Sequence, residues 1–317
     1  MNQVIKENLQ NFTAASGGAD SILYFGRKTS EEMSFKLSFK GGVNGYECNF
    51  SPTPEDNFYF SNENAWFRVK KQPRLYNEYM GSGHFESRIP ESDRNVARYV
   101  LKYLDSWRLY HFHDTSESAK VKQTCNIADN KTFHPDARNL AAFLYLLEKK
   151  HPDCFENIQD AVRMVAPFFD SFNLNPSQLN EDKILLEWKE KGSDDYFNAS
   201  ALSDGTLRFI CLATLLLQPE SKLPSIILLD EPELGLHPYA IAVLAGLLRS
   251  TSKYAQIIVA TQSVTLVNQF GPDDIVVVDR EKEQSVFCRL DRPDMECWLE
   301  EYGLGDLWEK NVLGGRP

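Results

Sequence analysis

The sequence predicts an α/β protein in which a lobe of antiparallel strands precedes an alternation of strands and helices. Three observations support this fold class. Apolar and polar residues alternate over 34–70, helical spacing of apolar residues dominates 116–180, and short Ile, Leu and Val runs alternate with helical segments over 200–280. A length of 317 residues is typical of roughly two domains.

The composition excludes several classes of protein. With 42% hydrophobic and 25% charged residues, the chain is neither disordered nor collagen-like. The net charge of −11 provides no general attraction to nucleic acid, so DNA binding is unsupported by charge. Lys70, Lys71 and Arg74 form a small basic cluster, which we expect to be a solvated face. The six cysteines contain no C-x-x-C pair and are expected to be free, buried thiols.

Nothing in the sequence predicts a membrane segment. The longest uncharged apolar stretch, 209–217, is far shorter than a transmembrane helix requires. The first ten residues have neither the apolar region nor the cleavage site of a secretory signal. We therefore expect a cytoplasmic protein with no membrane partner.

The N-terminal part reads as antiparallel strands. Apolar residues alternate over 35–39 and again over 46–50, on either side of a turn at glycines 41–42. Segments 58–60 and 66–69 suggest a third strand pair.

Helices are expected next in the chain. Apolar residues at helical spacing predict a helix over 90–107, and a short strand is expected over 109–112. Two further apolar stripes within 116–180 end before Pro152 and at Pro167, because the residue before a proline disfavours helix. We interpret 116–180 as a helical insertion.

The C-terminal part reads as a sheet with intervening helices. Its apolar runs lack alternation, which predicts strands covered on both faces. Pro238 suits the first position of a helix. The expected strands are 184–188, 225–229, 256–260 and 275–278, and the expected helices are 206–217, 238–250 and 264–269.

Two carboxylates end the strand expected at 225–229. Ligands of open α/β sheets bind outside the carboxyl ends of strands, where Asp230 and Glu231 would emerge. Asp230 could hold Mg²⁺ through water, and Glu231 could orient or deprotonate the water that attacks a γ-phosphate. The alternative is a solvated turn after a core strand.

Two further segments flank this pair. Ser203 suits an N-cap and Gly205 permits close approach of a ligand to the backbone, so this helix start could bind phosphate. Gln262 follows the next strand and could hydrogen-bond a γ-phosphate or the attacking water. The alternative for both segments is plain helix capping.

The order of these motifs resembles the ABC-type ATPases, and more closely their RecF/SMC/OLD-like AAA branch. In that branch, Ser203 and Gly205 correspond to the LSxG signature, and the run ending in Asp230-Glu231 corresponds to Walker B. His237 falls in the D-loop that contacts a partner subunit. Segment 107–150 and the ending LWEKNVLGGRP also look like a bacterial subfamily of such ATPases.

The resemblance implies a RecF-like P-loop ATPase core that uses ATP and Mg²⁺ as cofactors. It implies catalytic roles for Glu231 and Gln262, cofactor binding by Ser203, Gly205 and His237, and metal binding by Asp230. Such proteins work as nucleotide-sandwich dimers in DNA repair, chromosome maintenance or phage defence.

The resemblance also implies three parts of the chain. Residues 1–115 would hold the antiparallel lobe and the rest of the first ATPase lobe, and 116–180 a lid-like helical insertion. Residues 181–317 would form a second ATPase lobe with the signature, Walker B and switch motifs.

Three features depart from the family pattern. Gln262 stands where a switch histidine is usual, and Asp204 replaces a glycine of the signature, where its charge would repel phosphate unless it points away or meets a cation. No glycine in the chain is followed by lysine, so the G-x-x-x-x-G-K-[ST] P-loop is missing. We read the nearest lookalike, 26–29, as an ordinary turn, and expect the chain to lack its first strand and P-loop.

Two alternatives remain open for the function. The chain could be a partner subunit or decayed paralogue that contributes an interaction surface only, or supplies Ser203 and Gly205 to a P-loop-bearing subunit. A nuclease that uses acids at 273–274 and 279–281 is a weaker alternative. His111 and His113 could bind metal, but no third ligand is evident nearby, so we expect structural roles.

Overall fold

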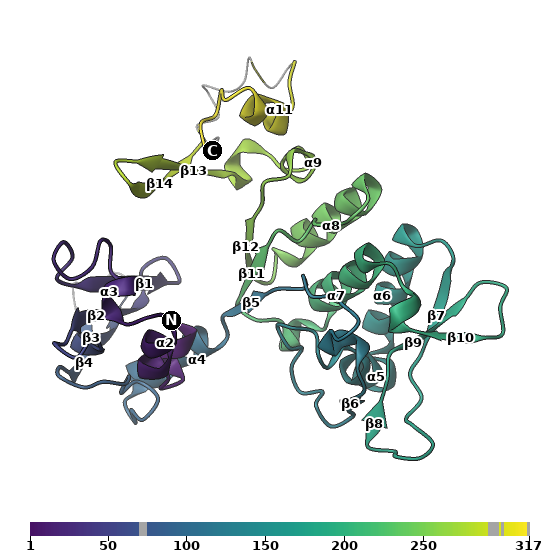
Figure 1. The fold of residues 1–317 in the computed structure, drawn as a ribbon, viewed down its shortest axis with the longest axis horizontal. Coiled ribbons are helices and arrows are strands. Elements are labelled where there is room, and N and C mark those ends of the chain that lie inside the picture. Colours follow the sequence, from purple (N-terminus) through teal and green to yellow (C-terminus); the bar gives the residue numbers. More distant parts are fainter. Residues whose placement is uncertain (70–74, 291–297, 299–300, 316–317) are drawn as a thin grey trace. The chain divides into compact units, whose positions relative to one another are not determined.

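A computed structural model of the chain describes residues 1–69, 75–290, 298 and 301–315. The chain forms two compact units, Met1–Trp107 and Arg108–Pro317 (Figure 1). Within the described ranges, no helix is both long and apolar enough to cross a bilayer. The basic cluster at 70–74 lies outside the described residues.

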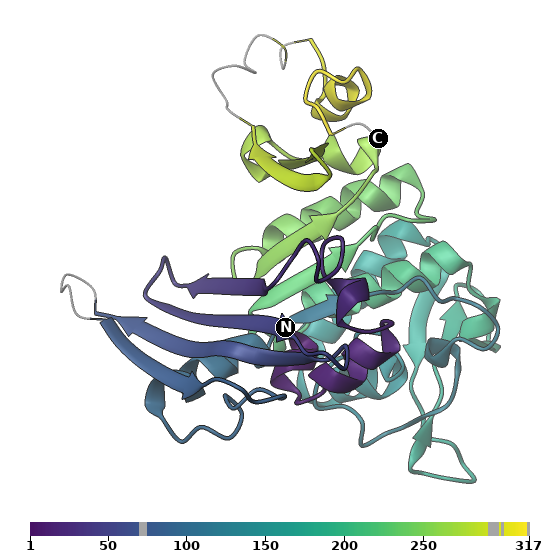
Figure 2. The same ribbon diagram turned by 60° about the vertical axis from the view of Figure 1, so that its left-hand side comes forward.

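The first unit is built on one antiparallel sheet of four strands in sequential order (Figure 2). The turn expected at glycines 41–42 connects its first two strands. The expected third strand pair is wrong, because 58–60 and 66–68 belong to one long strand, and the fourth strand was not predicted. The strands are β1 (Met33–Phe39), β2 (Asn44–Pro52), β3 (Phe58–Arg68) and β4 (Leu75–Gly81).

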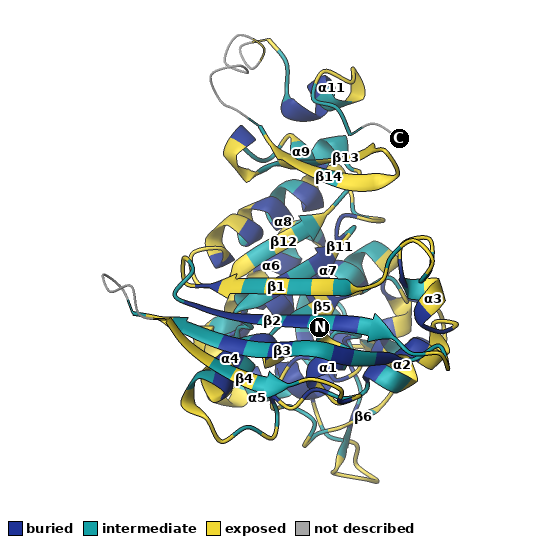
Figure 3. Ribbon diagram, turned by 90° about the vertical axis from the view of Figure 1, so that its left-hand side faces the viewer, coloured by how far each residue is buried: buried dark blue, intermediate teal, exposed yellow. Residues whose placement is uncertain are grey.

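Four helices accompany this sheet: α1 (Asn2–Ile5), α2 (Leu9–Ala15), α3 (Ala19–Ile22) and α4 (Asn95–Asp105). The helix α4 begins after the expected start at Pro90 and packs against β2 and β3. Figure 3 shows β2 and β3 as the most buried strands of the sheet. Gly26 begins a turn in which Arg27 pairs with Asp20 and Asp56, as expected for an ordinary turn.

A buried carboxylate organises the centre of the first unit. Glu63 on β3 is fully buried and accepts hydrogen bonds from the Tyr46 hydroxyl at 2.7 Å and the Arg88 backbone N–H at 3.0 Å. Its other neighbours are Ser87 and His84, whose Nε2 lies 2.8 Å away. Burial raises the pKa of Tyr46 well above 10. This polar network is a structural feature that the alternating pattern did not reveal.

The second unit contains a parallel sheet of three strands, β5 (Arg108–Tyr110), β11 (Ile226–Asp230) and β12 (Gln256–Ala260). The central strand is β11. On one face, Ile227 and Leu229 are buried in the main core. On the other face, Leu109 and Ile258 are 46% and 49% exposed, so the expectation that both faces are covered is wrong.

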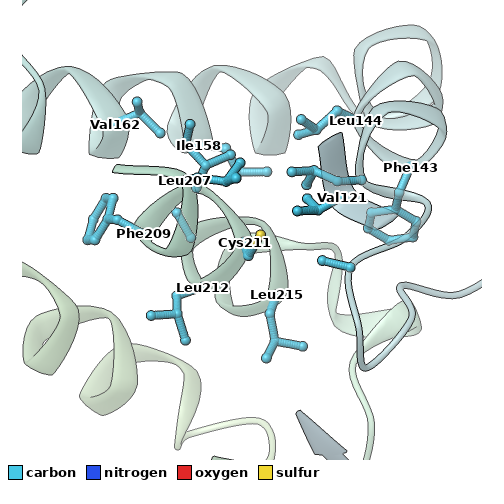
Figure 4. Close-up of a cluster of buried hydrophobic side chains, with 14 of the residues drawn as sticks. Val121, Phe143, Leu144, Ile158, Val162, Leu207, Phe209, Cys211, Leu212 and Leu215 are labelled. Atoms are coloured by element: carbon cyan, nitrogen blue, oxygen red, sulfur yellow. The ribbon is translucent and has the colours of Figure 1, made fainter. Parts of the chain in front are cut away.

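The core of this unit surrounds one helix, α7 (Asp204–Leu217) (Figure 4). Residues 209–216 of α7 are all buried, as expected for a helix that is apolar on every side. Each fully buried Leu or Phe contributes about 1.5–3 kcal/mol. The helices packed around α7 are α5 (Leu140–Lys150), α6 (Pro152–Val165) and α8 (Pro238–Thr251), which have the predicted positions.

Smaller sheets and single turns complete the core region. The strand expected at 184–188 is wrong, because it divides between two sheets. Three strands form an antiparallel sheet, β7 (Phe169–Asn173), β9 (Glu187–Glu190) and β10 (Tyr196–Asn198), and a pair consists of β6 (Cys125–Asn126) and β8 (Lys183–Ile184). The 3-10 turns are η1 (Lys120–Lys122), η2 (Ala199–Ala201), η3 (Glu220–Lys222) and η4 (Pro272–Asp274).

The C-terminal elements form a small cluster of their own, in which Leu304 and Leu307 are buried. The strand expected at 275–278 is wrong as a member of the main sheet, because it pairs with its successor in an antiparallel hairpin. The elements are α9 (Val264–Val267), β13 (Val276–Glu281), β14 (Gln284–Arg289) and α11 (Leu304–Glu309).

The described cysteines are all free. Cys48 and Cys211 are buried, and burial raises the pKa of Cys48 to about 12, so these thiols behave as inert core residues. Cys288 is exposed, and Cys125 and Cys154 are half-buried, which corrects the expectation for these three residues. Cys297 lies outside the described residues.

Candidate functional site

The acidic pair lies at the carboxyl end of the central parallel strand. Asp230 is the last residue of β11 and is paired in register with Ala260 of β12. The Glu231 backbone N–H donates to the Ala260 carbonyl at 2.8 Å, which continues the ladder by one residue. Glu231 has a φ of +40°, a conformation rare for a residue with a side chain and frequent at functional sites.

The neighbouring strand delivers the polar triplet to the same edge of the sheet. Thr261, Gln262 and Ser263 follow β12 directly, and we call these three residues the switch loop. The Ser263 side chain caps α9 by accepting the Leu266 backbone N–H at 3.2 Å. Gln262 itself is exposed. The register of two parallel strands therefore brings Gln262 and the acidic pair to one edge.

A third carboxyl group, Glu233, connects these two loops and was not predicted. The residue is 9% exposed, and its Oε1 accepts a hydrogen bond from the Thr261 hydroxyl. Its Oε2 is buried and has no hydrogen-bond partner among the described residues. Burial raises the pKa of Glu233, and the charges of Glu231 and Asp230 raise it further. The apolar strand before Asp230 and Glu231 pointed to these two acids, and no local pattern marked Glu233, the third acid of the Asp-Glu-Pro-Glu run.

The start of α7 has the expected cap. The Ser203 side chain accepts the Thr206 backbone N–H at 3.2 Å, and its hydroxyl lies 2.8 Å from that of Thr206. Gly205 follows in the first turn, where an added Cβ would lie 2.4 Å from the Gly235 carbonyl oxygen. The backbone of the loop after β11 thus lies so close to position 205 that only a glycine fits there.

The loop after β11 ends in the cap of the next helix. His237 is exposed, and its Nδ1 accepts the Tyr239 backbone N–H at 3.3 Å to cap α8. Asp204 is exposed in the first turn of α7, where its charge favours the helix N-terminus. Both residues have local roles at helix starts that are compatible with contacts to a ligand or a partner.

Arg208 connects the start of α7 to both loops of the site and was not predicted. Its guanidinium donates to the Leu234 carbonyl at 2.8 Å and to the His113 carbonyl at 2.9 Å. It also lines a small pocket with Asp230 and Glu231, whose volume of about 10 Å³ is enough for about one water molecule. A nucleotide therefore needs surfaces beyond these residues.

Two histidines reach the same edge, which corrects the expectation that they lack a third ligand nearby. Tyr110 pairs in register with Leu229, so His111 follows beside Asp230. The nitrogen and oxygen ligand atoms of His111, His113 and Asp230 all lie within 4.8 Å of one another. This proximity depends on the pairing of β5 with β11, which no local sequence pattern encodes.

The acids at the C-terminal end do not converge. Asp274 accepts the Gly271 backbone N–H at 3.2 Å, and Asp279 accepts the Gly315 backbone N–H at 3.2 Å. Over the described ranges, the histidines and Asp230 form the one group with the spacing of metal ligands. No observation therefore favours the nuclease alternative.

Comparisons with known proteins identify the family and the fold. A family model described as "AAA domain, putative AbiEii toxin, Type IV TA system" matches residues 10–268. No curated protein matches the sequence significantly. A solved SMC head bound to the C-terminal winged-helix domain of ScpA is similar over 93% of this chain and 86% of its own, with a TM-score of 0.59 and 15% identity.

Weaker structural matches are of the same kind. An SMC head domain from Thermotoga maritima has a TM-score of 0.38 and 13% identity over 78% of this chain and 75% of its own. An SMC head from Pyrococcus furiosus has a TM-score of 0.43 and 15% identity over 82% and 80%. The SMC head in the winged-helix complex, at 15% identity and a TM-score of 0.59, shows that the fold is shared.

Proposed function

This chain belongs to the AAA domain family of putative AbiEii toxins of type IV toxin–antitoxin systems, and on that premise we propose that it binds ATP with Mg²⁺ and takes part in ATP hydrolysis. Its fold is that of an SMC head, a mixed α/β ATPase architecture of the ABC type. The reaction site is the edge formed by Asp230, Glu231 and Gln262.

The observation that carries this proposal is the parallel register of β11 and β12. It places an acidic pair and an amide side by side at the carboxyl ends of two strands, where α/β proteins bind ligands. The side chain of Asp230 is 49% exposed, so its oxygens are open to a hydrated cation. Carboxylate oxygens of this kind suit Mg²⁺, which keeps several waters.

Each residue has a distinct role in the proposed reaction. Asp230 holds Mg²⁺, which when bound neutralises charge on the phosphates. Glu231 accepts a proton from the attacking water or orients it, and Gln262 hydrogen-bonds the γ-phosphate or that water. Glu233 acts through Thr261, because their hydrogen bond fixes the switch loop relative to the acidic pair.

The site is shared between polypeptides in this proposal. The 317 residues contain no P-loop, and the pocket beside Asp230 holds about one water molecule. A P-loop from outside these residues therefore completes the site. Ser203, Gly205 and His237 contribute to the nucleotide site of the partner, which is a second copy or a P-loop-bearing subunit.

The parts of the chain follow the resemblance to ABC-type ATPases. We assign 1–115 to the first ATPase lobe, 116–180 to a helical insertion and 181–317 to the second lobe with the reaction site. The biological process is the one the resemblance implies, DNA repair or phage defence in the cytoplasm.

The second candidate is a partner subunit that does not hydrolyse ATP. The small volume of the pocket beside Asp230 and Glu231, about 10 Å³, favours it, because no nucleotide fits there. The two candidates differ in whether Glu231 affects turnover, because an interaction surface alone has no use for a general base.

ATP turnover in a mixture tests the proposal. The full chain is titrated into a P-loop-bearing protein of the same family encoded in the same genome, and phosphate release is measured in Mg²⁺. The wild-type chain stimulates turnover, and Glu231→Gln lowers the stimulated rate at least about 100-fold because the general base is lost. Glu220→Gln is the control, since it makes the same change at an exposed residue of η3.

The outcomes separate the candidates. Stimulation that is equal for the wild type and Glu231→Gln rejects the assigned base and supports the interaction subunit. No stimulation by any form of the chain overturns the proposed ATPase function.

A further inference from the structure

We propose that His111, His113 and Asp230 form a binding site for a first-row transition-metal dication, with Zn²⁺ favoured over Mg²⁺. The site rests on the geometry of the second unit alone. Any effect of this metal on ATP turnover, through Asp230, rests in addition on the proposed function. Two imidazoles and one carboxylate are one of the ligand sets found in catalytic zinc sites, which keep a further position open.

The pairing of β5 with β11 brings the three ligands together. In register, Tyr110 lies opposite Leu229, and the next residues on the two strands are His111 and Asp230. The His111 Nδ1 lies 3.9 Å from the Asp230 Oδ2, and the rings of His111 and His113 have centroids 6.0 Å apart. All three ligand atoms lie within 4.8 Å of one another.

These distances are close to those of an occupied site. Bonds of about 2.0–2.1 Å at tetrahedral angles separate ligand atoms by about 3.3 Å. The side chains of His111 and Asp230 are 48% and 49% exposed, so small rotations can close the remaining gap. A separation of 3.9 Å is too long for a hydrogen bond, and none of the three side chains has a hydrogen-bond partner among the described residues.

The backbone that carries the histidines is held from the opposite side. Tyr110 and Phe112 alternate with the histidines and pack against Phe133, with centroids 6.5 and 5.9 Å away. The backbone N–H of His111 donates to the Pro135 carbonyl at 3.2 Å. Arg208 donates to the His113 carbonyl at 2.9 Å. The ligands therefore project from a fixed support, which a precise metal site requires.

The ligand chemistry decides the class of cation. Imidazole suits Zn²⁺ and its neighbours in the first transition row, whereas Mg²⁺ prefers oxygen ligands. Glu231 and Pro232 line the same pocket as His113 and Asp230, so an acidic and partly enclosed surface surrounds the cation. A transition metal at this position occupies the carboxylate that the proposed ATP reaction uses for Mg²⁺.

Calorimetric titration of the full chain with ZnCl₂, without nucleotide, tests the site. We expect one Zn²⁺ per chain, bound at least about 100-fold more tightly than Mg²⁺. The variants His111→Ala and His113→Ala are each expected to weaken Zn²⁺ binding at least about tenfold. His151→Ala is the matched control, because it removes a histidine whose side chain makes no capping hydrogen bond in α6.

A second measurement uses the wild-type chain only. Mn²⁺ bound to this site shows coupling to imidazole nitrogen in pulsed electron paramagnetic resonance. Absence of this coupling, or Zn²⁺ affinity that is the same in the wild type, His111→Ala and His113→Ala, overturns the proposal. Because neither measurement contains ATP, failure of the ATPase proposal leaves both results unchanged.

Discussion

At the carboxyl end of β11, the backbone sets the position of each side chain. Glu231 has a φ of +40°, which costs about 1–2 kcal/mol for a residue with a Cβ. Its backbone N–H still bonds Ala260, so the strained conformation is fixed by the neighbouring strand. The hydrogen bond to β12 thus stabilises a strained turn at Glu231, directly after Asp230.

The raised pKa of Glu233, in the loop after β11, makes the stability of the chain depend on pH. Its folded-state pKa is raised, first by burial, so the folded chain binds a proton more tightly than the unfolded chain. The free energy of unfolding therefore decreases as pH rises from the ordinary value of 4.5 through the raised pKa. Below 4.5, both states are protonated and the penalty vanishes.

Replacing Glu233 by Gln removes this penalty. We expect Glu233→Gln to gain stability relative to the wild type as pH rises from 4 to 8, because the amide cannot ionise. Thermal unfolding across this range, in a buffer with chelator, measures the difference. Glu220→Gln, at an exposed residue, is expected to show no such trend. A difference between Glu233→Gln and the wild type that does not change with pH contradicts the assignment.

At the scale of elements, α7 joins the core to the site. Its residues 209–216 are buried among α5, α6 and α8, and its first turn contacts the loop after β11. Gly205 permits this contact, since its Cα faces the Gly235 carbonyl. The loop after β11 therefore packs directly against the helix start that we propose to contact a partner's nucleotide.

The contact at Gly205 gives a matched pair of substitutions. Gly205→Ala places a Cβ 2.4 Å from the Gly235 carbonyl and is expected to lower the free energy of unfolding by about 1–3 kcal/mol. Gly246→Ala in α8 meets no atom within 4 Å and is expected to raise it by about 0.5–1 kcal/mol, because alanine favours helix. Chemical denaturation measures both, and equal effects of the two changes would contradict the packing account.

Local patterns predicted the elements that carry the site. The apolar run before Asp230 predicted β11, the Ser203 cap predicted the start of α7, and Pro238 predicted the start of α8. Each of these depends on residues adjacent in sequence. Capping and strand burial are local effects, so a single sequence contains enough information to locate them.

Pairing between distant segments was not predictable in the same way. His111 lies beside Asp230 because β5 pairs with β11, and β13 leaves the main sheet because it pairs with β14. Polar residues in the middle of β3, including the buried Glu63, made one strand look like two. The choice of strand partner depends on the whole fold, and a buried polar residue is recognised only from the partners that surround it.

At the scale of the whole molecule, we propose that the chain is a subunit that supplies part of a nucleotide site. The second unit contains the acidic pair, the switch loop and the start of α7 within one compact body. The P-loop is the part that the 317 residues do not contain. We therefore expect ATP to bind this chain weakly when it is alone, through Mg²⁺ at Asp230.

Saturation-transfer NMR of ATP with the full chain, with and without Mg²⁺, measures this binding because the method detects weak ligands. The account predicts transfer to ATP that depends on Mg²⁺, with an affinity at least about tenfold lower in Asp230→Asn, a loss of about 1.4 kcal/mol. Asp153→Asn, at an exposed residue in the first turn of α6, is predicted to bind as the wild type does. Transfer that is independent of Mg²⁺, or equal in Asp230→Asn and the wild type, would contradict the account.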